Sequence, residues 1–134
     1  MRWMDRTLFY SPVAYGLCVD EREFRKMLRK FKQDPSQPFL PTPQSNAATH
    51  FFPDPDGKQI AVVCIHPNPK GITIHQVNAM LVHEAMHIWR CIRENIGEDE
   101  PSSEFEAYVM QAISQSLMMS YAKQAKRHLK SKRK

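Results

Sequence analysis

A chain of 134 residues, 42% of them hydrophobic, is long enough to bury one core and too short for two ordinary domains. It has no run of about 18 apolar residues, the length that a membrane span needs, and its start lacks a signal-peptide pattern, so we expect a soluble, cytoplasmic protein. Cys18, Cys64 and Cys91 are widely spaced, which argues against a disulfide framework and a cysteine zinc site and favours reduced thiols.

The net charge of +5 is concentrated at one end of the chain. Residues 123–134 hold seven Lys and Arg and no acid, which leaves 12 basic against 14 acidic residues in the first 122. We therefore predict one domain over residues 1–122 and a basic, disordered tail over residues 123–134. Such a tail is either only solvated or binds nucleic acid, an acidic partner or an anionic membrane surface.

The first segments predict a strand and then a helix. Residues 7–19 are rich in β-branched and aromatic side chains but contain Pro12 and Gly16, which indicates a short edge strand or an extended entry segment. Residues 20–31 place apolar side chains at helical spacing opposite a basic face, and Asp20 is a typical N-cap. This pattern predicts an amphipathic helix.

A proline-rich loop over residues 33–47 leads into a predicted hairpin. Residues 49–52 and 58–65 are strand-like, and the turn between them contains Asp56-Gly57, a strong hairpin signal. Every residue from 60 to 65 is apolar, so we expect this strand to be covered on both faces. It is either plain sheet core or a strand that pairs with an extended peptide.

Two long helices follow. Thr73 and Gln76 predict a capping box that opens a helix over residues 74–97, ended near Gly97. A second helix is predicted over residues 102–125 after Pro101. Its methionines, including Met118 and Met119, are core or, where exposed, a surface for a partner or a homodimer.

The first long helix contains His83-Glu84-Ala85-Met86-His87. Positions i and i+4 of a helix point the same way, so His83 and His87 can bind one zinc ion. Glu84 lies beside that face, where it can act as general base toward a water molecule that attacks a carbonyl. A shuffled chain of this composition would contain H-E-x-x-H about once or twice in a hundred trials, so the pattern is informative.

Two histidines and a water leave a tetrahedral zinc one ligand short. Glu104 and Glu106 in the last helix are the carboxylates available, and two residues apart they face nearly opposite ways. Ser103 and Glu106 fit a capping box, which gives Glu106 a structural role and leaves Glu104 as the expected ligand. His50, His66 and His75 are further candidates for oxyanion stabilisation, or ordinary loop and surface histidines.

His83–His87 followed by a helix with Glu104-Phe105-Glu106-Ala107-Tyr108 resembles the gluzincin metallopeptidases, and residues 82–108 are similar to small HExxH proteins encoded in bacteriophage and prophage genomes. The resemblance covers about a third of the chain. It implies His83, His87 and Glu104 as zinc ligands and Glu84 as the catalytic base. Many gluzincins have an Asp where this chain has Tyr108, so Tyr108 would orient a zinc-bound histidine or donate to the oxyanion.

These observations predict an α+β domain with a minimal zincin-like core: an N-terminal helix, a small antiparallel sheet, and two long helices that hold the metal. The expected function is zinc-dependent hydrolysis of a peptide or protein substrate in the cytoplasm of a bacterium that carries the phage. Two alternatives remain: a non-catalytic protein that zinc stabilises, and a nucleic-acid-binding protein that uses the basic tail.

Overall fold

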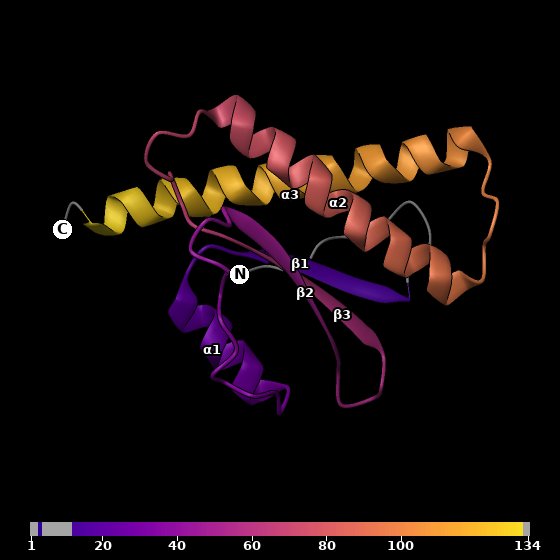
Figure 1. The fold of residues 1–134 in the computed structure, drawn as a ribbon, viewed down its shortest axis with the longest axis horizontal. Helices are drawn as coiled ribbons and strands as arrows, with labels where there is room; N and C mark the ends of the chain where they lie inside the picture. Colours follow the sequence, from indigo (N-terminus) through magenta and orange to yellow (C-terminus); the bar gives the residue numbers. More distant parts are fainter. Residues whose placement is uncertain (1–2, 4–11, 133–134) are drawn as a thin grey trace.

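The computed structural model describes residues 3 and 12–132, which form an α+β fold as predicted (Figure 1). Residues 7–11 of the first predicted segment and residues 133–134 of the predicted tail lie outside the described part of the chain. The elements in chain order are β1 (Val13–Cys18), α1 (Glu21–Lys30), β2 (Ala47–Pro53), β3 (Gln59–Ile65), α2 (Ile74–Ile96) and α3 (Ser103–Lys132).

The three strands form one sheet in the order β1-β3-β2. β2 and β3 are the antiparallel hairpin that the sequence predicts, with Ala47 opposite Ile65. β1 runs parallel to β3, with Val13 opposite Gln59, so the sheet is mixed and the prediction of an antiparallel sheet was wrong. Parallel neighbours need a long connection between them, and α1, the proline-rich loop and β2 together supply it.

The side chains of β3 alternate between two cores, which confirms that this strand is covered on both faces. Ala61, Val63 and Ile65 belong to the larger core with α2 and α3. The residues between them, Val62 among them, belong to a smaller cluster with α1. The sheet therefore lies between α1 on one side and the pair α2 and α3 on the other (Figure 1).

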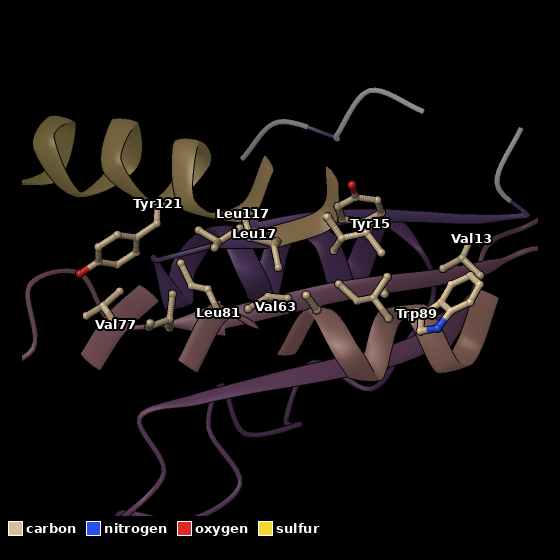
Figure 2. Packing of buried hydrophobic residues seen from close by; sticks show 14 of the residues in the cluster. Val13, Tyr15, Leu17, Val63, Val77, Leu81, Trp89, Leu117 and Tyr121 are labelled. Carbon is tan, nitrogen blue, oxygen red and sulfur yellow. The ribbon is translucent and has the colours of Figure 1, made fainter. Parts of the chain in front are cut away.

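α2 begins and ends where the sequence predicts. The Thr73 hydroxyl accepts a hydrogen bond from the backbone N–H of Gln76, and the Gln76 side chain accepts one from the backbone N–H of Thr73. Gly97 ends the helix in the left-handed conformation, at φ 69°. Between these caps, Leu81 and Trp89 are among the residues that point into the large core, where Figure 2 shows Leu81 near Val63 of β3 and Trp89 near Val13 of β1.

α3 continues through the described part of the basic tail and ends at Lys132, so the prediction of a disordered tail was wrong there. Hydrogen bonds hold these turns against the body. The Tyr121 hydroxyl accepts from the backbone N–H of Asn68 at 2.9 Å, and the Gln124 side chain donates to the Leu17 carbonyl at 2.8 Å. Lys and Arg are good helix formers, so the basic composition extends the helix once tertiary contacts hold it.

None of the helices in the described part of the chain has the apolar length that a bilayer span requires.

The three cysteines are free thiols, and two of them are buried in the sheet. Burial raises the pKa of Cys18 to about 11, and burial also raises the pKa of its neighbour Cys64. Cys91 on α2 is only partly buried, with a smaller rise in its pKa from the same cause.

We predict that iodoacetamide at pH 8 labels the native chain once, at Cys91. The thiolate is the reactive form, and the raised pKa of the other two thiols and their burial keep them protonated and out of reach. Intact mass and peptide mapping would measure the labelling, with the urea-unfolded chain as the control that takes three labels. Early labelling of Cys18 in the native chain would contradict the packing of β1 against β3.

We predict that Leu81→Ala lowers the free energy of unfolding by about 2 to 5 kcal/mol, because the substitution opens a cavity among residues that have no access to solvent. Val82→Ala, at the next position, is the matched control, since Val82 is 40% exposed and its loss should change stability by about 0.5 kcal/mol or less. Urea unfolding followed by circular dichroism measures both. Equal effects would mean that α2 packs through a different face.

Candidate metal centre

The two histidines of the motif lie one turn apart on the exposed side of α2. Their Nε2 atoms are 3.2 Å apart, and their ring centroids are 5.0 Å apart. Helical geometry brings the side chains to the same side, and the two Nε2 atoms lie within hydrogen-bond distance of each other. Without an ion, one ring would donate its Nε2–H to the other.

This separation fits a shared zinc ion. Two nitrogens that each lie about 2.0 to 2.1 Å from a tetrahedral zinc are about 3.3 to 3.4 Å apart, by the geometry of the tetrahedron. The separation of 3.2 Å between His83 Nε2 and His87 Nε2 differs from that value by about a tenth or two of an ångström. Both rings can therefore reach one ion without a change of backbone.

Glu84 differs from the histidines on either side of it because it is buried, with only 5% of its surface exposed. Its Oε2 atom accepts a hydrogen bond from the hydroxyl of Thr49 on β2. A carboxylate under a strand needs such a donor, since a buried charge without a partner is costly. The hydrogen bond therefore fixes the Glu84 carboxylate in one place next to the histidines.

Sequence reasoning missed Thr49. The sequence shows that Thr49 is a hydroxyl-bearing residue in the first strand of the predicted hairpin. It does not show which helix packs on the side of the sheet that Thr49 faces. In the observed register, Thr49 lies opposite Val63, and Val63 packs in the core with α2. Thr49 therefore faces α2.

An open hollow of about 370 Å³ lies between the beginning of β2 and α2. The residues that line it are Asn46, Ala47, Ala79, Met80, His83 and Glu84. Its volume falls within the range of about 300 to 1,000 Å³ that is usual for small-ligand sites. A histidine and the motif carboxylate thus share a hollow whose other walls are largely small or apolar.

Glu106 has a structural role, although a different one from the predicted capping box. Its carboxylate accepts a hydrogen bond of 2.7 Å from the indole Nε1–H of the fully buried Trp89. Trp89 follows His87 by two residues, which places the two side chains on opposite sides of α2. The first turn of α3 therefore meets α2 on the side away from the histidines.

The N-terminus of α3 is capped by Ser102, whose hydroxyl accepts from the backbone N–H of Phe105 at 3.2 Å. The prediction that Ser103 and Glu106 form the cap was therefore wrong. Glu104 is exposed in this first turn. Across residues 3 and 12–132, no three His, Cys, Asp or Glu side chains are grouped to hold one ion, so the structure does not bring Glu104 to the histidines, and its role as ligand stays a prediction.

Tyr108 is 57% exposed on α3 and does not line the hollow that His83 and Glu84 share. Its proposed role toward a histidine or an oxyanion likewise stays a prediction.

Two of the other histidines belong to the opposite side of the sheet. The Nε2 atom of His50 is 2.9 Å from the Phe39 carbonyl, and its ring lies against Phe24. The ring of His66 lies against Phe39 at 5.0 Å. His75 is exposed two turns before the motif and does not line the hollow.

The strand over Gln59–Ile65 was a candidate to pair with an extended peptide, and this prediction was wrong. β3 is the central strand and is hydrogen-bonded on both edges, to β1 and to β2. The sheet edge next to the hollow belongs to β2, which also carries Thr49.

Comparison with protein-family models, with curated proteins and with solved structures gives no match for this chain.

We predict that Glu106→Ala lowers the free energy of unfolding by about 1 to 3 kcal/mol, because the buried indole N–H of Trp89 loses its acceptor. Glu104→Ala is the matched control, two residues away in the same helical turn, and should change stability by about 0.5 kcal/mol or less because its side chain is exposed. Thermal or urea unfolding measures both in the metal-free chain. A larger loss in the free energy of unfolding for Glu104→Ala than for Glu106→Ala would mean that Glu104, and not Glu106, faces α2.

Proposed function

We propose that this protein is a zinc-dependent metallopeptidase in which His83 and His87 bind the ion and Glu84 is the general base. The observation that carries the proposal is the 3.2 Å approach of the two Nε2 atoms beside a buried carboxylate. Burial of the Glu84 carboxylate within the apolar face of α2 is unfavourable, and packing contacts alone do not offset that free energy. A shared chemical role accounts for all three residues.

Zinc, when bound, would polarise the substrate carbonyl and lower the pKa of a water molecule toward about 7. With the ion held by His83 and His87, the Glu84 carboxylate would accept a proton from that water as the oxygen of the water attacks the carbonyl carbon. Thr49 donates to Oε2 and helps to hold the carboxylate while it takes the proton. Glu84 then delivers the proton to the amine nitrogen as the C–N bond breaks, which returns the carboxylate to its starting state.

The substrate that this arrangement favours is an extended peptide. β2 is an edge strand beside the hollow, and an edge strand can pair with a peptide backbone. Ala47, Ala79 and Met80 would receive a small or apolar side chain of that peptide. On the basis of the resemblance to phage-encoded HExxH proteins, we also propose that the substrate lies in the bacterial cytoplasm.

Glu104 remains our candidate for the third ligand on the basis of the gluzincin resemblance, with Tyr108 as its neighbour one turn along α3. The orientation of α3 favours a second candidate function, a zinc-stabilised binding protein without turnover, because Glu106 and Trp89 direct the first turn of α3 away from the histidines. In a peptidase, Glu84 is needed for turnover. In a zinc-stabilised binding protein, Glu84 affects stability alone.

We predict that the purified chain binds about one zinc ion and that the double variant His83→Ala/His87→Ala binds none, because each imidazole supplies one of the few ligands. His75→Ala is the control on the same helix and should keep the metal. Plasma mass spectrometry of the dialysed proteins gives the zinc content. Equal zinc in the double variant would remove the basis of the proposal.

We predict that Glu84→Gln keeps the zinc and loses turnover by about 10²- to 10⁴-fold, since glutamine can still accept from Thr49 but cannot take a proton. Glu94→Gln, at an exposed position of the same helix, is the matched control and should retain activity. Cleavage of a mixed peptide library, followed by mass spectrometry, measures turnover. Zinc binding without cleavage by the unmodified chain would favour the non-catalytic alternative.

A further inference from the structure

The last turns of α3 carry a concentration of positive charge. No acidic residue follows Glu106 in the chain. Beyond Tyr121 the exposed side chains of the helix are mostly cationic: Lys123, Lys126, Arg127, Lys130 and Lys132. These residues belong to regular helix, so their charges are held in a fixed array.

Four of these five cations lie along one side of the helix and form a basic stripe. Positions 123, 126, 127 and 130 follow steps of three and four residues, which share a helix face. Tyr121 and Ala125 are buried on the opposite side. From Lys123 to Lys130 the stripe is about 10 Å long at a rise of 1.5 Å per residue.

The contacts of Asn68 and Gln124 hold this part of α3 against the body. Asn68 belongs to the loop before α2, and two residues further on the loop carries another exposed cation, Lys70. Figure 1 shows the C-terminal turns of α3 extending past the beginning of α2, so the stripe lies at one end of the molecule.

The acidic residues at the beginning of α1 are used locally. Asp20 accepts from the backbone N–H of Arg22 as the N-cap of α1, and Glu21 pairs with Arg25 at 3.8 Å. These contacts account for Asp20 and Glu21, the first two acidic residues that follow β1, the strand to which Gln124 is bound.

We propose that the basic stripe of α3, formed by Lys123, Lys126, Arg127 and Lys130, binds the phosphate backbone of duplex nucleic acid without reading its sequence. Duplex DNA carries about one negative charge per 1.7 Å of its axis, so a stripe of about 10 Å meets several phosphates at once. Binding of this kind depends on charge and spacing alone, and the stripe supplies both.

Two other anionic partners fit the stripe less well. A helix that lies in a membrane interface must insert its apolar face, and here Tyr121 and Ala125 on that face are already packed in the core. Single-stranded nucleic acid is bound largely through stacking on aromatic side chains. No Phe, Tyr or Trp follows Tyr121, which is itself buried, and His128 is the only ring beyond it.

The test uses the full chain and a fluorescein-labelled duplex of mixed sequence, about 20 base pairs long, titrated at several salt concentrations. The α3 variant is Lys126→Gln/Arg127→Gln/Lys130→Gln. The matched control is Lys26→Gln/Arg29→Gln/Lys30→Gln on α1, which removes the same charge from another exposed helix face. Circular dichroism checks that both variants keep their helices, and Lys126→Arg/Lys130→Arg is the charge-preserving variant.

We expect the unmodified chain to bind the duplex with an affinity that falls steeply with salt. The α3 variant should bind at least about tenfold more weakly, and the slope of log K against log salt should fall by about 2 to 3. The α1 variant and the Lys-to-Arg variant should bind within about twofold of the unmodified chain.

An equal loss in the α1 variant would overturn the proposal, because net charge alone would then explain binding. Absence of salt-dependent binding at about 50 mM salt would overturn it as well. Binding to phosphatidylserine vesicles or to polyglutamate in place of the duplex would assign the stripe to a membrane or an acidic protein. Each measurement is made on the metal-free chain too, and unchanged affinity there separates this proposal from the zinc site.

Discussion

The central strand of the sheet is apolar on both faces, and the rest of the fold satisfies that constraint. All six side chains from Ile60 to Ile65 are buried, and each face of β3 must therefore be covered by a helix. α1 covers one face, and α2 with α3 covers the other. β1 and β2 pair with the two edges of β3, which completes its backbone hydrogen bonds.

The same constraint creates the candidate site. α2 must place an apolar face on the sheet, so the histidines of the motif lie on its outer side, while Glu84 falls within the buried face. Its carboxylate then needs a donor, and the register that sets Thr49 opposite Val63 provides one. A shift of one residue would turn Thr49 to the other face of the sheet. The pairing of the hairpin and the position of the candidate general base are therefore linked, although they belong to distant parts of the sequence.

The sequence predicts what local chemistry determines. The capping box at Thr73, the left-handed Gly97 and the Asp56-Gly57 turn all encode their structure within a few residues, and the element boundaries next to them agree with the prediction to within one residue. The parallel pairing of β1, the Thr49 donor and the Glu106–Trp89 hydrogen bond depend on residues 17 to 46 positions apart, for which the sequence holds no local signal. The helical tail was missed for the same reason, since contacts with Asn68 and Leu17 hold it.

X-ray absorption at the zinc edge of the zinc-loaded full chain reports the atoms bonded to the ion, and it therefore tests directly whether His83 and His87 bind zinc. We expect two imidazole nitrogens at about 2.0 to 2.1 Å, with oxygen ligands completing a four-coordinate site. The imidazole signal should disappear in the His83→Ala/His87→Ala variant. Sulfur at about 2.3 Å, or a shell without imidazole, would place the metal elsewhere and contradict the assignment of His83 and His87.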